Sequence, residues 1–142
     1  MPADDDEHVV FLQETEPNDT SGDAMSLGAA GAYSFQGVCR KDESQDWYVG
    51  TARSGEIDAS LYVSLSPPRP PEGWEPEESD VEPIATISLK TASLSDIVPS
   101  TPVSPDKPLV VSGQVASAGD VYVRIGCPTG RTLWYSAVVY IP

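Results

Sequence analysis

Positive charge is scarce in this chain. Eight lysine and arginine side chains stand against 22 aspartates and glutamates, which gives a formal net charge of −14. A surface of that sign repels nucleic acid and anionic membranes, so neither is an expected partner. The sequence also has no run of 18 apolar residues and no basic start followed by an apolar core. We therefore expect no membrane insertion and no signal peptide, as in the mature part of a secreted or cell-surface protein.

The usual sequence signatures of catalysis are missing as well. The only histidine, His8, lies in an acidic opening stretch without a cysteine or second histidine nearby, which argues against a zinc site. The chain has no Gly-x-Ser-x-Gly elbow and no phosphate-binding glycine loop. Its many carboxylates include no pair in an evidently apolar setting, which a glycosidase acid requires. We predict a binding or accessory module and not an enzyme.

Oxygen-bearing side chains are concentrated near the start, around Pro17. Glu14, Glu16, Asn18 and Asp19 supply carboxylate and amide oxygens, the ligands that Ca²⁺ takes six to eight at a time. Proline favours extended geometry in the residue before it, and in an extended segment alternate residues share a face. The pattern indicates a cation site. The alternative is a solvated acidic linker in which Asn-Asp-Thr forms a turn or a helix cap.

A second acidic group, with Asp42, Glu43 and Asp46, precedes an aromatic pair at positions 47 and 48. The order of motifs is Glu-x-Glu-Pro-Asn-Asp-Thr, a later alanine (Ala24), a glycine closing a short strand (Gly37), and Asp-Trp-Tyr. This order resembles the bacterial pre-peptidase C-terminal domain family, which includes the collagen-binding domains of clostridial collagenases. The resemblance covers about residues 12–142 and is specific over 14–55.

The resemblance implies that the two acidic segments bind Ca²⁺ together. Ser44 stands where the family often has an acid, and Asp42 or Glu43 is the expected substitute. Losing one charged ligand lowers the affinity or removes one of two ions, so we expect one Ca²⁺ and leave a second open. The expected ligands are Glu14, Glu16, Asn18, Asp19 and Asp46, with Asp42 and Glu43 as substitutes.

Cys39 and Cys127 are the only cysteines. Both fall near the ends of strand-like runs, so neighbouring strands can bring them within reach. A disulfide that closes so long a loop contributes about 4 kcal/mol in the chain-entropy model. The alternative is two buried small side chains, since free cysteine is commonly buried. The family resemblance does not decide between them.

Alternation of apolar and polar residues dominates the rest of the chain. It predicts an all-β fold, an antiparallel, jelly-roll-like β-sandwich. A hairpin is expected through Ser54 and Gly55, and one helical turn at most between Asp23 as cap and Gly28 as stop. A proline-punctuated crossing is expected at 99–108. The expected strands, about eight, cover 9–12, 33–38, 47–52, 56–65, 84–90, 109–115, 120–127 and 132–141.

The stretch 66–83 contains six prolines and six acidic residues. Because proline cannot donate to a strand ladder, this stretch is predicted to be a long exposed loop, mobile and dispensable for folding. Trp74 within it is either a partner contact or a residue that folds back onto the sandwich. Together with a flexible acidic segment at 1–12, the pattern predicts one domain at 13–142.

These features favour a secreted, non-catalytic, calcium-binding attachment or interaction domain of an extracellular protein or assembly. Its ligand is expected to be an extracellular protein or polysaccharide. A structural subunit that binds a protein through the proline-rich loop or a sheet edge is the main alternative. Carbohydrate binding is a third, based on the aromatic residues Trp134, Tyr135 and Tyr140, which are expected to cover one sheet face and which packing alone also explains.

Overall fold

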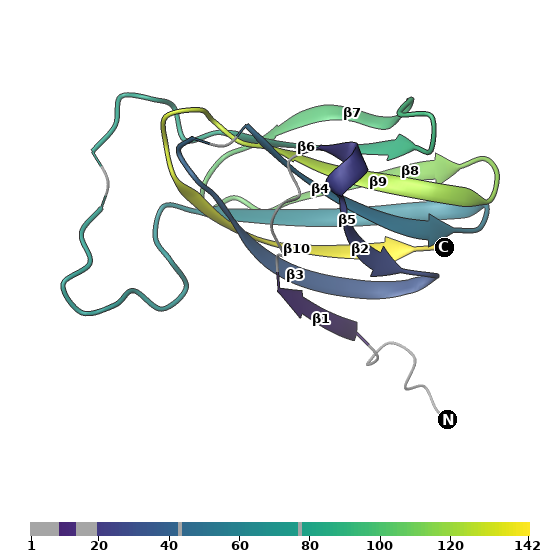
Figure 1. Cartoon of the computed structure of the whole chain (residues 1–142), viewed down its shortest axis with the longest axis horizontal. Coiled ribbons are helices and arrows are strands. Elements are labelled where there is room, and N and C mark those ends of the chain that lie inside the picture. Colours follow the sequence, from purple (N-terminus) through teal and green to yellow (C-terminus); the bar gives the residue numbers. More distant parts are fainter. Residues whose placement is uncertain (1–8, 14–19, 43, 77) are drawn as a thin grey trace.

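The computed structural model describes residues 9–13, 20–42, 44–76 and 78–142, and shows two five-stranded sheets packed face to face (Figure 1). The predicted all-β sandwich is confirmed, with ten strands instead of about eight. In chain order the elements are β1 (Val9–Gln13), the 3-10 helix η2 (Ser21–Asp23), β2 (Met25–Gly28), β3 (Gly31–Cys39), β4 (Gln45–Ala52), β5 (Gly55–Ser64), β6 (Ala85–Thr91), β7 (Asp96–Val103), β8 (Leu109–Val115), β9 (Gly119–Gly126) and β10 (Leu133–Ile141).

The core lies between the sheets and is built from the inward positions of each strand. Successive side chains of a strand point to opposite faces, so alternate apolar residues reach the same interior. Each large apolar side chain buried in this way contributes about 1.5–3 kcal/mol. The inward faces that alternation predicts for β5, β6 and β9 are confirmed for ten residues that are at most 1% exposed: Ile57, Ala59, Leu61, Val63, Ala85, Ile87, Leu89, Val121, Val123 and Ile125. Leu65, which alternation also assigns to the inward face of β5, lies after the end of that strand and is 38% exposed.

The strand order is β1-β3-β10-β5-β8 in one sheet, called sheet A, and β2-β4-β9-β6-β7 in the other, called sheet B. All neighbours are antiparallel except two pairs at the edges, where β1 runs parallel to β3 and β2 runs parallel to β4. The chain therefore passes from an edge of sheet A to an edge of sheet B between Gln13 and Met25. Strand β1 confirms the strand expected at 9–12 and extends it by one residue, to Gln13.

The expected hairpin through Ser54 and Gly55 is wrong. Strand β4 pairs with β2 and β9 in sheet B, whereas β5 pairs with β10 and β8 in sheet A. The turn at Gly55, whose φ is +142°, therefore carries the chain from one sheet to the other. Alternation identifies the inward face of each strand but not its neighbour. The apolar faces of β4 and β5 would be buried both in a hairpin within one sheet and in two opposite sheets.

The crossing expected at 99–108 is also corrected, because β7 runs through Pro99 and continues to Val103. Proline has no N–H to donate to a neighbouring strand, so within a sheet it is tolerated mainly in edge strands. Strand β7 lies at the edge of sheet B, where β6 is its one neighbour. The helical turn is a 3-10 helix of three residues, and Thr20, not Asp23, is its N-cap. In the part of the chain that the structure describes, no helix has the length and hydrophobicity that a bilayer crossing requires.

Gly50 is a point of close packing between the sheets. A Cβ added there would collide with the Ile141 side chain and lie 3.0 Å from the Gly28 carbonyl oxygen. We expect Gly50→Ala to lower the free energy of unfolding by about 1–3 kcal/mol, as overpacked cores do, measured by thermal or urea unfolding. Gly22→Ala is the matched control, because the nearest atom to its added Cβ is 3.9 Å away. Equal stabilities of the two variants would contradict this packing.

Cys39 and Cys127 form a disulfide that joins the end of β3 in sheet A to the residue after β9 in sheet B, with their Cα atoms 5.5 Å apart. We expect the intact mass to be unchanged by alkylation without reductant and to gain two alkyl groups after reduction. Reduction should lower the free energy of unfolding by about 4 kcal/mol, because a long loop of the unfolded chain is released. Two free thiols in protein from an oxidising compartment would contradict the bond.

Candidate functional site at the loop end of the sandwich

Three loops meet at one end of the sandwich, which we call the loop end: 40–44 between β3 and β4, 65–84 between β5 and β6, and 127–132 between β9 and β10 (Figure 1). Backbone hydrogen bonds join the first and the third. Gly130 donates its N–H to the Lys41 carbonyl at 2.7 Å, and Cys127 donates to the Ser44 carbonyl at 2.9 Å. The disulfide lies at the base of the same two loops, so covalent and hydrogen bonds hold this end together.

The proline-rich loop 66–83 is attached to this end by its C-terminal half. Arg131 donates to the carbonyls of Ser79 and Val81 at 2.9 and 3.1 Å. The Ser79 hydroxyl donates to the Gly130 carbonyl at 3.2 Å. No strand or helix occurs among the described residues of this loop, which agrees with the loop predicted from its prolines.

Trp74 folds back onto the sandwich, the second of the two interpretations of this residue. Its ring is half-buried and meets the Trp134 ring edge to face, with 6.1 Å between centroids. A turn in which the Trp74 N–H donates to the Pro71 carbonyl at 3.0 Å, with Gly73 at a φ of +84°, directs the side chain inward. Contact with Trp134 removes part of the apolar Trp74 ring from water, which is favourable.

Asp46 is the charged residue that is fully buried in the described part of the chain. It points inward from β4, where the Tyr135 hydroxyl donates to its Oδ2 at 2.7 Å. The Tyr135 proton is used in that bond, so the Tyr48 hydroxyl is the donor in the contact between the two tyrosines. A carboxylate in an apolar interior is tolerated only when donors or cations compensate its lost hydration, and the tyrosine pair supplies part of that compensation.

The disulfide lies beside this carboxylate. Atoms of Cys39, Cys127 and Asp46 all fall within 4.8 Å of one another. Both sulfurs are committed to the disulfide, and metal binding requires a thiolate, so the cysteines are not ligands. Within this group, the Asp46 carboxylate is the side chain with the chemistry to bind a hard cation.

Of the seven expected calcium ligands, the structure describes two. Asp46 is buried as above, and Asp42 lies in an exposed turn of the loop between β3 and β4. The described residues include no cluster that brings these two carboxylates together with a third ligand. The other five lie outside the described residues: Glu14, Glu16, Asn18, Asp19 and Glu43.

The two flanks of the segment 14–19 are placed, however. On one side Gln13 is level with Gln36 of β3, three residues before Cys39 and the loop 40–44. On the other side Thr20 caps η2 by accepting the Asp23 N–H at 3.3 Å, and η2 packs beside β4, the strand that carries Asp46. The flanks thus attach to the two strands that the loop 40–44 connects.

The expectation that Trp134, Tyr135 and Tyr140 cover one sheet face is wrong for Tyr135. Neighbouring residues of a strand point to opposite faces, so Tyr135 faces the core and is 4% exposed, while Trp134 and Tyr140 face outward on sheet A. Sequence reasoning therefore missed Tyr135 as the partner of Asp46. The alternation along β10 signals its inward direction, but nothing in the sequence signals its contact with a residue of β4.

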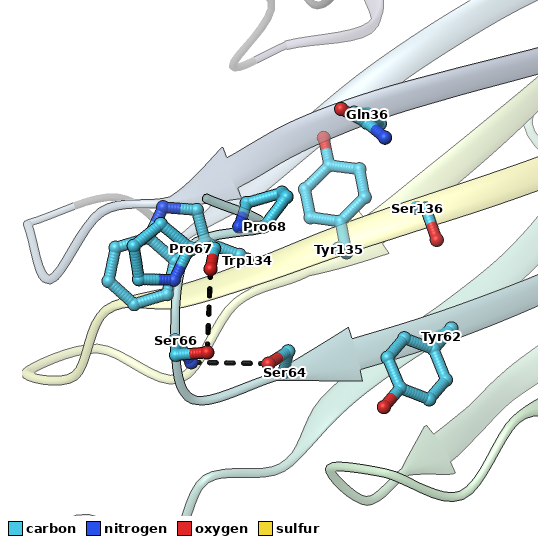
Figure 2. A pocket seen from close by; sticks show the side chains of 9 residues that line it. All are labelled: Gln36, Tyr62, Ser64, Ser66, Pro67, Pro68, Trp134, Tyr135 and Ser136. Atoms are coloured by element: carbon cyan, nitrogen blue, oxygen red, sulfur yellow. Dashed lines mark hydrogen bonds between the residues drawn. The ribbon is translucent and has the colours of Figure 1, made fainter. Parts of the chain in front are cut away.

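The outward side of Trp134 borders a hollow of about 300 Å³ on sheet A (Figure 2). A second hollow of about 230 Å³ adjoins it toward β1 and shares with it Gln36, Pro68, Trp134 and Tyr135. We call the two together the outer groove. The first hollow is lined by Gln36, Tyr62, Ser64, Ser66, Pro67, Pro68, Trp134, Tyr135 and Ser136.

One side of the outer groove is held by Asp106, a residue that the sequence analysis did not single out. Its φ is +62°, a strained value outside glycine. Asp106 donates its N–H to the Val63 carbonyl at 2.8 Å, and its carboxylate accepts the Tyr62 hydroxyl at 2.8 Å. This hydrogen bond stabilises the neutral phenol and raises the pKa of Tyr62, with desolvation and the negative charge of Asp106 acting in the same direction.

Comparisons with known proteins place the fold. No family model and no curated protein matches the chain in sequence. Among solved structures, the pre-peptidase C-terminal domain of a collagenase from Bacillus anthracis superposes with a TM-score of 0.54 at 15% identity, covering 89% of this chain and 99% of that domain.

Two further matches are weaker. The periplasmic g-type lysozyme inhibitor of Aeromonas hydrophila has a TM-score of 0.47 at 10% identity, covering 94% of this chain and 96% of that one. The Yersinia pseudotuberculosis-derived mitogen has a TM-score of 0.47 at 14% identity, covering 80% and 87%. Identities this low describe the architecture alone. The chain thus shares its β-sandwich fold with the pre-peptidase C-terminal domain of the Bacillus anthracis collagenase, and the resemblance predicted from the acidic and aromatic motifs is confirmed at the level of the fold.

Proposed function

We propose that this chain is a non-catalytic, calcium-stabilised binding domain of an exported protein, which attaches that protein to an extracellular protein or polysaccharide. The observation that supports the calcium part of the proposal is the fully buried carboxylate of Asp46 at the loop end. Asp46 belongs to β4, and the two flanks of the segment 14–19 attach to β3 and to β4. The disulfide supports export, since such bonds persist in oxidising compartments.

The electrostatics of the chain favour a divalent cation at this end. Net charge is −14, and the described flanks of the acidic segment 14–19 attach to β3 and β4, the two strands that the loop 40–44 connects. Two unit charges 4 Å apart repel by roughly 4 kcal/mol at an effective dielectric of 20, before screening by salt. A Ca²⁺ ion reverses the sign of that interaction and accepts the oxygen ligands that aspartate, glutamate and asparagine offer.

In this proposal Asp46 is the fixed, buried ligand, because Tyr135 already orients its carboxylate. The segment 14–19 supplies further oxygen ligands and is held to the sandwich by the ion. Bound Ca²⁺ supplies positive charge and no chemistry of bond making or breaking. The proposed ligands are Glu14, Glu16, Asn18, Asp19 and Asp46, with Asp42 or Glu43 in the place of the acid that Ser44 replaces.

The non-catalytic part of the proposal is supported by the fold. The domain that this chain resembles in structure is one part of a collagenase and is described as its pre-peptidase C-terminal domain. In this chain the single histidine, His8, lies outside the described residues, and the sequence signatures of nucleophilic catalysis are missing. A binding role requires only a stable sandwich with an accessible surface.

Calcium is expected to stabilise the folded protein. At a hundredfold excess of free Ca²⁺ over Kd, the free energy of unfolding should rise by about 2.7 kcal/mol relative to EDTA, because the ion binds the folded state alone. Mg²⁺ should stabilise less, since it dehydrates reluctantly and demands tighter geometry. The measurements are thermal unfolding in EDTA, CaCl₂ and MgCl₂, and calorimetric titration with CaCl₂.

Glu16→Ala and Asp46→Asn should reduce or abolish that stabilisation. Asp120→Asn is the matched control, because Asp120 is an exposed acid on β9 at the opposite end of the sandwich and should leave the calcium response unchanged. An unfolding midpoint in the parent protein that is the same in EDTA and in millimolar CaCl₂, with no heat of binding, would disprove the calcium part of the proposal.

A further inference from the structure

The outer groove lies on the middle of sheet A, where β10 runs between β3 and β5. Its floor has two levels. At the first, Gln36, Ser136 and Tyr62 are paired across the three strands, and at the next Val38, Trp134 and Ser64 are paired. Outward residues two positions apart on neighbouring strands are about 7–8 Å from one another. Two aromatic rings, of Tyr62 and Trp134, thus occupy one diagonal of the floor.

Polar groups occupy three of the other four positions, and Val38 occupies the fourth. Gln36 contributes an amide, and Ser64 and Ser136 contribute hydroxyls, all on the lining of the same hollow (Figure 2). An amide and a hydroxyl each act as donor and acceptor, which suits a partner that also presents hydroxyl groups.

The larger hollow has no carboxylate, ammonium or guanidinium group on its lining, although the whole chain has a net charge of −14. The Asp106 carboxylate is engaged by the Tyr62 hydroxyl outside this lining, and the adjoining hollow contains one guanidinium group, that of Arg40. The ligand that fits this lining is therefore uncharged.

The two aromatic rings are held in place before any ligand arrives. The strained residue Asp106 fixes the Tyr62 hydroxyl, and Tyr62 nevertheless keeps 40% of its surface exposed. Trp134 is held edge to face by Trp74. Backbone strain that is retained at a surface position is typical of functional sites. A rigid aromatic side chain loses little conformational entropy on binding, which makes such a pair an efficient contact surface.

We propose that the outer groove binds a neutral polysaccharide, whose sugar rings present apolar C–H faces to Tyr62 and Trp134 and hydroxyl edges to Gln36, Ser64 and Ser136. This proposal rests on the proposed function of the chain as a binding domain and names the chemical class of its ligand. The adjoining hollow toward β1 extends the groove across the sheet, so that more than one sugar unit is accommodated. Asp106 is a positioning residue, because it acts through Tyr62.

A peptide ligand fits this position less well. An added peptide strand requires unpaired backbone groups at a sheet edge, whereas β10 is hydrogen bonded to β3 on one side and to β5 on the other. A proline-rich peptide docks on exposed aromatic grooves, but here Pro67 and Pro68 of the chain itself already line the wall beside Trp134.

Affinity electrophoresis in native gels containing 1,4-β-xylan, galactomannan or mixed-linkage β-glucan tests the proposal, with gelatin gels as the peptide arm. We expect at least one neutral polysaccharide to retard the protein. Trp134→Ala and Tyr62→Ala should lower the association constant about tenfold or more, and Gln36→Ala should lower it as well. Gln36 is exposed, so Gln36→Ala tests the groove even where Trp134→Ala fails to fold. Tyr140→Ala is the matched control, because Tyr140 lies outward on the same strand but away from the hollow, and it should bind as the parent does.

The role of Asp106 has its own readout. Asp106→Ala should weaken binding, whereas Asp106→Asn should retain it, since asparagine tolerates positive φ and accepts the Tyr62 hydrogen bond. Removing the charge should also lower the pKa of Tyr62 toward its ordinary value. The measurement is an NMR titration of the Tyr62 ring signals, assigned with Tyr62→Phe, because the five other tyrosines also contribute to tyrosinate absorbance. In the parent, binding should persist below the ordinary tyrosine pKa and be lost as pH rises through the raised one.

The gels are run in CaCl₂ and in EDTA, so that the two proposals fail separately. An unfolding midpoint that is the same in CaCl₂ and in EDTA, together with retained retardation in the gels, overturns the calcium site alone. No retardation by any of the three neutral polysaccharides, equal retardation of parent and groove variants, or retardation in gelatin alone overturns the polysaccharide site.

Discussion

Burial of one apolar face of each sheet against the other is the constraint on which this structure depends. Strands of both sheets contribute alternate residues to a single core. Within it, the rings of Phe35 from sheet A and Tyr48 from sheet B are in contact. The outward residues are thereby free to vary, and the loops at the ends carry little of the packing. The outer groove occupies such outward positions on sheet A, whereas the candidate site at the loop end includes the inward residue Asp46.

Asp46 is the exception within this core. It occupies an inward position of β4 that the alternation assigns to an apolar side chain, and its carboxylate is compensated by the hydroxyl of Tyr135 from the opposite sheet. The disulfide closes the same end. A buried charge that needs specific partners is a poor source of stability, and this is the physical basis for the binding role that we propose for Asp46. Sites that break the local pattern of a fold are where function is expected.

The outer groove differs from the loop end in its electrostatics. The described part of the loop end carries the buried carboxylate of Asp46 and the exposed carboxylate of Asp42, where we propose a cation site, whereas the larger hollow is lined by aromatic, hydroxyl and amide groups on an otherwise acidic protein. The proline-rich loop connects the two, because its start lines the hollow through Pro67 and Pro68, and its later part is hydrogen bonded to Gly130 and Arg131 at the loop end.

The sequence by itself determined the inward face of most strands, the all-β class and the loop at 66–83, because period-two alternation and proline are local signals. It also indicated Asp46 as a site residue, from the motif that precedes Trp47 and Tyr48. Only the tertiary structure decided that β4 and β5 belong to different sheets, that β7 passes through its prolines at an edge, and that Tyr135 meets Asp46. These features depend on which strands become neighbours. The sequence pattern shows that each strand has an apolar face, but several different pairings of distant strands would bury that face equally well. The outer groove was out of reach for the same reason, since Gln36, Tyr62 and Trp134 are brought together by the register of three strands far apart in the chain.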